Sequence, residues 1–259
     1  MSAAPHLRVV AGGDPHGYMD VVTPLVRRFL GMRDDEPTEL AFFERGKRIH
    51  VAQAMTAEAH AELLREGSGL RNFEAAYMLV NGPIEPAIFH RYPHDRVCWA
   101  DNERVKDHEV QRRRAVFIDI DVERAKGISA TDTELDAARA VADLVESFLA
   151  DVLGGDSAIG RGCSGNGYFL LIAIEPIAVP PKGQTDDAAE RISGFLGLLA
   201  RRFNAPPIKI DTAVFNAARL MPAPGTMKCK GLDSPERPHR RASFVCRMNP
   251  TRVPLERLC

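Results

Sequence analysis

The sequence predicts an α/β or α+β fold, and three observations lead to this prediction. Segments with apolar residues at helical spacing alternate along the whole chain with short apolar runs typical of strands. The 259 residues, of which 45% are hydrophobic, can bury a core of ordinary size, as one large domain or two small, closely packed ones. The sequence has no internal repeat and no low-complexity linker, which favours a single unit over 1–259.

The first part of the chain is expected to form two helices and three strands. Apolar residues recur at helical spacing over 21–30, although Pro24 limits how far back that helix reaches. A second helix is expected over 56–66, with Thr56 as its N-cap and Gly67 as its stop. The expected strands are 40–43, 49–54 and 75–80.

The second part has clearer signals. A compact apolar strand over 115–118 runs directly into the acidic triplet Asp119-Ile120-Asp121. Thr131 and Glu134 form a capping-box pattern, and the apolar stripe that follows predicts a helix that ends at Gly154-Gly155. The other expected elements are strand 168–174, helix 187–203, and short strands at 208–211, 219–221 and 242–246.

Composition excludes several classes of protein. No apolar run approaches the roughly 18–20 residues of a membrane span, so we expect no membrane association. The N-terminal residues lack the apolar core of a secretory signal. The five cysteines are an odd number and no two are spaced as CxxC, which indicates reduced thiols and a cytoplasmic location rather than a disulfide scaffold or structural zinc site.

The net charge of −1 conceals an uneven distribution. Residues 201–259 hold 12 Lys and Arg against 4 Asp and Glu, a balance of +8, whereas residues 1–200 carry −9. A basic C-terminal quarter could face a polyanion. The charges could equally interleave in the folded protein, and composition alone leaves both interpretations open.

Asp119 and Asp121 are the first candidates for chemistry. Side chains at i and i+2 of a strand emerge on the same face, so both carboxylates can reach one cation or a pair of cations. Two adjacent carboxylates at the end of an apolar strand are costly unless a positive charge offsets them, and a divalent metal would do so. The same DxD pattern occurs in metal-dependent glycosyltransferases, in phosphatases and by chance on exposed strand ends.

Two later segments supply further candidates. A glycine-rich turn, 162–168, could present backbone N–H groups to an anion, with Ser164 and Asn166 as added donors, or could be a plain tight turn. Asp211 ends a short strand and is followed by polar and basic residues that suit a site for metal and phosphates, or simply a solvated loop: Asn216, Arg219, Thr226, Lys228 and Lys230. Three carboxylates, a glycine loop and a basic stretch together match two-metal nucleotidyl transfer.

These segments also resemble a known family. The order RRRAVFIDIDVERAKGISATDTE, CSGNGYFLLIAIE and IKIDTAVFNAARLMPAPGTMKCKGLDSPERPHR is similar to the archaeo-eukaryotic primase superfamily, in particular to the primase-polymerase domains of phage, plasmid and bacterial replication proteins. The similarity is continuous over about 75–241. It implies an RRM-like catalytic sheet (about 115–250) packed with a smaller N-terminal α/β module (about 1–114), with the active site in the cleft between them.

The resemblance implies roles by position. Asp119, Asp121 and Asp211 match the metal-binding carboxylates, which would hold two Mg²⁺ or Mn²⁺ ions. The loop that handles the incoming nucleotide is matched by Ser164, Gly165, Asn166 and Gly167, and the cations near the triphosphate by Arg219 and Lys230. The implied ligands are an NTP or dNTP and a single-stranded DNA template, and relatives often work with a replicative helicase in cis or in trans.

One position departs from the family pattern. The second motif commonly ends in a His that contacts nucleotide phosphate, and this chain has Phe169 there. By its position Phe169 is expected among the nucleotide-binding residues, with altered nucleotide handling. Arg161 is a candidate to replace that contact, and Arg161, Arg237 and Arg240 are weak candidates to contact nucleic acid. The alternatives to a primase-polymerase are a non-catalytic or weakly active template-binding replication-initiation module of the same fold and, less favoured, a DxD nucleotide-sugar transferase.

Overall fold

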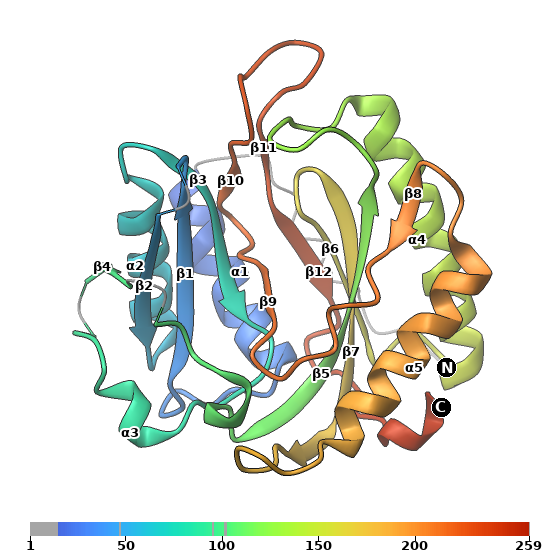
Figure 1. Cartoon of the computed structure of the whole chain (residues 1–259), viewed down its shortest axis with the longest axis horizontal. Helices are drawn as coiled ribbons and strands as arrows, with labels where there is room; N and C mark the ends of the chain where they lie inside the picture. Colours follow the sequence, from blue (N-terminus) through green and yellow to red (C-terminus); the bar gives the residue numbers. More distant parts are fainter. Residues whose placement is uncertain (1–14, 47, 95, 101–102, 259) are drawn as a thin grey trace.

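Two five-stranded sheets and five α-helices make up the computed structural model, which describes residues 15–46, 48–94, 96–100 and 103–258 (Figure 1). All pairings between strands of these two sheets are antiparallel. The larger apolar core draws residues from both sheets and from the helices α1, α2, α4 and α5. The coarse prediction of a mixed α+β fold is therefore confirmed.

The N-terminal sheet has the strand order β4-β2-β1-β3-β9. Its first four members come from the N-terminal part of the chain: β1 (Thr38–Glu44), β2 (Ile49–Ala54), β3 (Phe73–Leu79) and β4 (Cys98–Trp99). The fifth, β9 (Leu220–Pro222), comes from far along the chain and pairs Leu220 with Leu79 and Pro222 with Tyr77. This pairing brings the basic segment after residue 211 against the first part of the chain.

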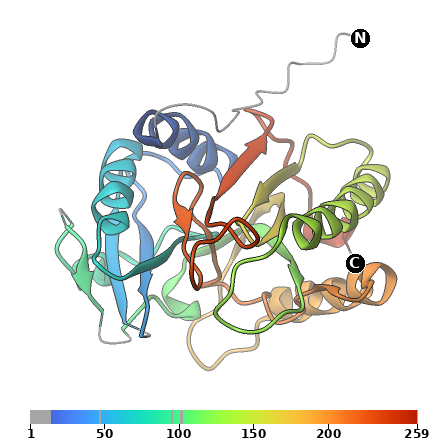
Figure 2. The same ribbon diagram turned by 90° about the horizontal axis from the view of Figure 1, so that it is seen from above.

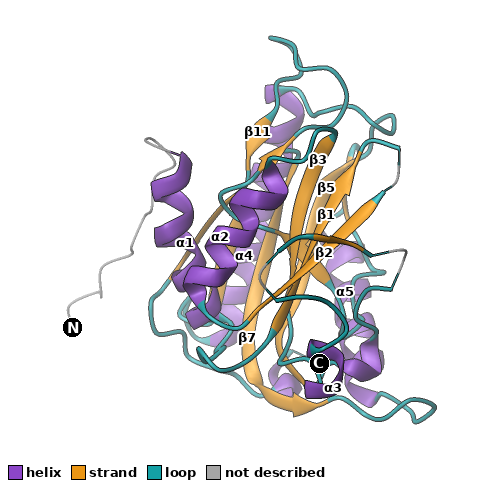
Figure 3. Ribbon diagram, turned by 90° about the vertical axis from the view of Figure 1, so that its left-hand side faces the viewer, coloured by secondary structure: helices purple, strands orange, loops and turns teal. Residues whose placement is uncertain are grey.

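Helices α1 (Pro15–Phe29) and α2 (Ala57–Ser68) pack together on one side of the N-terminal sheet (Figure 3). Pro24 lies inside α1, so the expectation that it limits the helix was wrong; the buried apolar face of α1, including Val22 and Phe29, outweighs the lost backbone hydrogen bond. Gly67 does not stop α2 either, since the helix continues to Ser68. A Cβ at Gly67 would lie 2.2 Å from the Phe42 ring. Its role is to allow close packing of helix on sheet.

The second sheet has the order β12-β6-β7-β5-β8. Its strands are β5 (Arg112–Val122), β6 (Ile159–Cys163), β7 (Gly167–Ala178), β8 (Ile208–Ile210) and β12 (Ser243–Cys246). Helices α4 (Asp132–Leu153) and α5 (Asp187–Phe203) cover the outer side of this sheet, away from the N-terminal sheet (Figure 1). The predicted capping box of Thr131 and Glu134 is present, and α4 ends at Gly154 in the left-handed conformation, φ 72°.

A two-stranded ribbon of β10 (Met227–Lys228) and β11 (Arg240–Arg241) lies between the two sheets (Figure 2). The Cys229 N–H just after β10 donates to the Glu74 carbonyl of β3 at 2.7 Å. Three short helices complete the described elements: α3 (Pro86–Phe89), and the 3-10 helices η1 (Asp107–Glu109) and η2 (Leu255–Arg257). The ribbon and β9 together bring the basic segment to the junction of the sheets.

Candidate functional site

Three carboxylates meet at one end of the second sheet. Asp119 and Asp121 lie two residues apart on β5 and therefore share a face. Strand β8 pairs with β5 through Ile120 and Ile210, so Asp211, the next residue, is placed beside them. The Asp211 N–H donates to the Asp119 carbonyl at 2.9 Å, which fixes this juxtaposition. The pairing of the strands thus gathers the three residues that the sequence singled out.

Asp119 is the electrostatic centre of this group. Burial and the negative charges of Asp121 and Asp211 together raise the pKa of its carboxyl to about 7, while Lys228 and Arg219 act in the opposite direction. Among the described residues, the Asp119 carboxyl has no hydrogen-bond or ion-pair partner. The protein therefore places a carboxylate without a direct partner where a further cation would be favoured.

The other two carboxylates are held by local partners. Asp121 Oδ1 lies 3.3 Å from the Arg124 guanidinium, and Asp211 Oδ1 accepts a hydrogen bond from the Ala213 N–H at 2.8 Å. Carboxylate oxygens are the ligands that Mg²⁺ and Mn²⁺ prefer. Within the described part of the chain, however, no group of three or more His, Cys, Asp and Glu side chains is arranged to hold a metal ion.

The glycine-rich loop before β7 is packed closely against the acidic strand. A Cβ on Gly167 would lie 2.7 Å from the Ile120 carbonyl oxygen and 3.0 Å from Asp121 Oδ1. Gly165 has φ +87°, and a Cβ there would lie 2.8 Å from the Arg240 carbonyl oxygen. Only glycine at both positions allows the loop to lie between β5 and β11.

This loop does not present its N–H groups to an anion as the sequence suggested. The Ser164 N–H donates to the Gly167 carbonyl, the Gly165 N–H to the Cys163 sulfur, and the Asn166 N–H to the Ser164 hydroxyl. The Asn166 carbonyl oxygen accepts from the Ala130 N–H at 2.7 Å, while its buried Nδ2 has no partner among the described residues. The N–H groups of Ser164, Gly165 and Asn166 are thus all used within the loop. What the loop contributes to the site is its close packing beside Asp121.

Phe169 is part of the core and does not reach the site surface. It is directly across from Asp119 in the β5–β7 pair, and its side chain is fully buried. Its ring stacks on Phe244 with centroids 6.2 Å apart, lies 5.6 Å from the Phe117 ring and covers Gly162. The expectation that Phe169 contacts nucleotide is not supported by this position. It forms the apolar floor beneath Asp119 and so contributes to the burial that raises the Asp119 pKa.

Cations line the opposite wall of the site. Arg219 donates to the Asn216 side-chain oxygen at 3.0 Å and to the Ala213 carbonyl at 2.8 Å. Burial lowers the Arg219 pKa, and the charges of Asp211 and Asp119 oppose that shift. Lys230 lies near enough to Tyr77 for its charge to lower the pKa of that phenol. Arg219 therefore lies near Asp119 and Asp211, whereas Lys230 is placed here only by its proximity to Tyr77, and the phosphate-binding roles of both stay predictions.

Sequence reasoning missed one pair in this wall. Lys228 is buried on β10, donates a hydrogen bond to the Tyr77 hydroxyl and lies 4.1 Å from the centre of the Tyr77 ring. Burial lowers the pKa of Lys228 to about 8 and raises that of Tyr77 to about 12. Lys228 was recognised only as a member of a basic stretch. Tyr77 gave no signal, because the β3–β9 pairing that brings it here is long-range.

Three of the predicted arginines lie elsewhere. Residues alternate faces along β6, and Arg161 pairs with Leu170, so its side chain lies on the α4 side of the sheet, opposite Asp119. There it contacts carboxylates of α4, Asp143 and Glu146. The suggested replacement of the missing phosphate contact by Arg161 is therefore not supported.

Arg237 and Arg240 fasten the β10–β11 ribbon to the start of α4. Arg237 pairs with Glu134 at 2.9 Å and donates to the Ser129 carbonyl at 2.7 Å. Arg240 pairs with Asp132 at 2.6 Å and donates to the Ala130 carbonyl at the same distance. Both guanidinium groups are used within the protein, which gives them a structural role, and the nucleic-acid contact suggested by the sequence stays a prediction.

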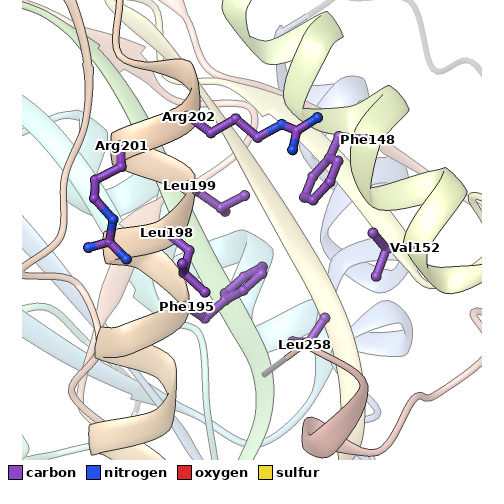
Figure 4. A pocket seen from close by; sticks show the side chains of 8 residues that line it. All are labelled: Phe148, Val152, Phe195, Leu198, Leu199, Arg201, Arg202 and Leu258. Carbon is purple, nitrogen blue, oxygen red and sulfur yellow. The ribbon is translucent and has the colours of Figure 1, made fainter.

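Two cavities differ in their relation to the carboxylates. A cavity of about 310 Å³ adjoins the site and is lined by Phe43, Tyr77, Arg104, Asn216, Ala218, Arg219 and Leu220. A more apolar cavity of about 400 Å³ lies between α4 and α5, on the far side of the second sheet (Figure 4). It is lined by Phe148, Val152, Phe195, Leu198, Leu199, Arg201, Arg202 and Leu258. Only the first cavity combines charged and aromatic side chains next to the carboxylates.

No helix within the described ranges is both long and apolar enough to cross a membrane. Cys98, Cys163, Cys229 and Cys246 are free thiols, while Cys259 lies outside the described residues.

Comparison with known proteins identifies no relative from which a function could be transferred. No protein-family model matches the chain, and neither a curated protein nor a solved structure is significantly similar to it.

Proposed function

We propose that this chain is the catalytic domain of a primase-polymerase, with an RRM-like second sheet. It would make or extend primers on a single-stranded DNA template by nucleotidyl transfer, using an NTP or dNTP. The observation that carries the proposal is Asp119: a carboxylate with a raised pKa and no partner in the described structure, flanked by two further carboxylates and faced by cations. Such a charge arrangement is costly without a ligand that supplies positive charge.

The residues divide into two functional groups. Asp119, Asp121 and Asp211 would hold two Mg²⁺ or Mn²⁺ ions; bound there, these ions would activate the attacking 3′-hydroxyl and stabilise the leaving pyrophosphate. On the other wall, Arg219 and Lys230 would bind the polyphosphate and hold the α-phosphate toward that hydroxyl. The bond formed joins the 3′-oxygen to the α-phosphorus, and the bond broken releases pyrophosphate.

The cavity of about 310 Å³ supports a nucleotide as the small ligand. Its volume is within the range of ordinary ligand pockets. Phe43 and Tyr77 give it an aromatic wall, with ring centroids 5.2 Å apart, suited to a sugar or base. Arg219 joins this cavity to the carboxylates, because its charge acts on Asp119 and Asp211.

A template-binding module without catalysis is the second candidate. It is favoured by the burial of Phe169 and by the internal hydrogen bonds of the glycine loop, both of which remove expected phosphate contacts. The uncompensated Asp119 favours the enzyme, because a binding module gains nothing from a buried carboxylate that opposes folding above its pKa.

A gel assay separates the two candidates. Labelled NTPs and dNTPs are supplied with Mg²⁺ or Mn²⁺ on primed and unprimed single-stranded DNA. The wild-type protein should yield products, and D119A/D121A should lose at least about 100-fold of the rate. The matched control is D136A/D151A, which removes two exposed carboxylates of α4 and should retain the wild-type rate. Template binding without any product would favour the second candidate, and undiminished synthesis by D119A/D121A would overturn the assignment.

A further inference from the structure

Arg104 is a cation of the nucleotide cavity that the sequence did not indicate. It comes from the segment between β4 and η1, in the first part of the chain, and lines the same cavity as Arg219. In the described part of the structure its guanidinium makes no hydrogen bond or ion pair. The charge of Arg104 acts on Arg219: burial is the main cause that lowers the Arg219 pKa, and the charge of Arg104 lowers it further. Two cations that line one small cavity favour an anionic ligand.

A buried carboxylate holds the backbone next to Arg104. Glu39 of β1 is 1% exposed, and both of its oxygens accept from the Val105 N–H at 3.1 Å. Burial raises the pKa of Glu39 to about 7, while the Val105 hydrogen bond and the charge of Arg104 lower it. The buried carboxylate is directed at the residue immediately after Arg104, so Glu39 sets where Arg104 enters the cavity.

The segment that carries Arg104 also holds the loop that carries Arg219. Asp107 of η1 accepts from the Asn216 side chain at 3.0 Å and from the Ala218 N–H at 2.7 Å. Residues 104–107 therefore link the N-terminal sheet, through Glu39, to the loop that carries Arg219. Hydrogen bonds that range from the buried Glu39–Val105 contact to the exposed Asn216–Asp107 contact therefore connect the segment of Arg104 to the loop of Arg219.

We propose that Arg104 is a further binding residue of this cavity, which contacts the phosphates of the nucleotide together with Arg219, and that Glu39 is its positioning residue. The inference rests on the proposed function and names a contact that the carboxylates do not supply. A cavity of about 310 Å³ fits a single nucleotide rather than a strand, which favours the nucleotide phosphates over the template backbone as the anion.

Equilibrium binding of dATP and of uncharged deoxyadenosine, each with Mg²⁺, tests the role of Arg104. R104A should bind dATP about 10-fold more weakly, since it loses one charge-assisted contact, and should bind deoxyadenosine within about twofold of wild type. R104K should recover part of the loss. R112A, which removes an exposed arginine at the start of β5 away from the cavity, is the control and should leave both affinities unchanged.

Each other outcome has a definite meaning. If wild-type protein binds no triphosphate, the proposed function fails. If it binds dATP and R104A binds equally well, the inference about Arg104 is overturned while the proposed function stands. If R104A weakens binding of single-stranded DNA and leaves dATP affinity intact, Arg104 serves the template and the inference is also overturned.

The role of Glu39 needs a measurement that general destabilisation would not reproduce. E39A leaves the Val105 N–H without an acceptor and should raise the KM for dNTP by about 5-fold, with kcat within about twofold. E39Q keeps one acceptor oxygen and should restore most of the KM. E39A combined with R104A should add little to R104A alone, because both changes remove the same contact. The positioning role would be refuted if the KM effects of E39A and R104A multiply fully in the double variant, or if E39A lowers kcat at constant KM. If E39A does not fold, E39D replaces it in the same double-mutant cycle.

Discussion

Replacing Asp119 with Asn should stabilise the protein while it disables the site. In the folded, metal-free protein the Asp119 carboxyl keeps its proton until about pH 7, whereas in the unfolded chain it loses the proton near its ordinary pKa of 3.8. Between these values the folded state binds more protons than the unfolded state, so wild-type stability falls as pH rises from about 4 to 7. Because Asn does not titrate, D119N should not lose this stability as the pH rises.

The size of the effect follows from the shift. One pKa unit corresponds to about 1.4 kcal/mol, so the rise from 3.8 to about 7 sets a ceiling of about 4 kcal/mol over the whole titration. Between pH 5 and pH 8 the stability advantage of D119N over wild type should therefore grow by about 2–3 kcal/mol. Above pH 8 this advantage should grow no further, because the Asp119 carboxyl is then ionised in both the folded and the unfolded protein.

Urea unfolding at pH 5, 6, 7 and 8 in the presence of EDTA measures this difference. D136N is the control: Asp136 is exposed and pairs with Arg139 on the surface of α4, so its substitution should change stability by less than about 1 kcal/mol at every pH. A D119N advantage that stays constant or shrinks as pH rises would refute the electrostatic description of Asp119. Added Mg²⁺ at pH 8 should then stabilise wild type and leave D119N unaffected.

Three further outcomes are expected from the packing of the site. G167A should lower activity by at least about 10-fold, because its Cβ would collide with the Ile120 carbonyl beside Asp121. The control G194A in α5 places its Cβ in open space and should stabilise the protein by about 0.5–1 kcal/mol in urea unfolding. Equal activities for the two variants would contradict this prediction. F169H should lower the free energy of unfolding by about 1–3 kcal/mol without tightening dATP binding, since it places a polar ring in the core; tighter binding would show that this position does reach the nucleotide. R161A should lower the midpoint of thermal unfolding and leave dATP affinity unchanged, because Arg161 pairs with Asp143 and Glu146 across the sheet; weaker binding would show that Arg161 does contribute to the site.

Much of the local structure could be predicted from the sequence because it is encoded locally. The capping box before α4 and the apolar strand leading into Asp119 both rest on residues within a few positions of each other. Strand β6 was missed for a physical reason. Its Gly160 and Gly162 weaken a strand pattern, but a Cβ at these positions would lie 2.5 Å from the Phe244 ring and 2.0 Å from the Phe169 ring, so the core requires them.

The rest of the site depends on long-range pairing that no local pattern encodes. The proximity of Asp211 to Asp119 was expected from the resemblance, but Tyr77 and Arg104 join the site only because β9 crosses into the N-terminal sheet. The orientation of Arg161 depends on strand register, since a shift of one residue would turn its side chain to the other face. The uneven charge distribution also has a structural counterpart. The basic quarter of the chain supplies Arg219 and Lys228, whose charges act on Asp119, and Lys230, whose charge acts on Tyr77.

The most direct test of the central claim is the rate of template-directed incorporation of a single nucleotide by D119N, D121N and D211N. If the three carboxylates act as one unit in nucleotidyl transfer, each variant should lose at least about 100-fold of the wild-type rate, and double variants should lose little more. D136N should retain the wild-type rate. Incorporation at the wild-type rate by any one of the three variants would contradict the assignment of these carboxylates as the catalytic centre.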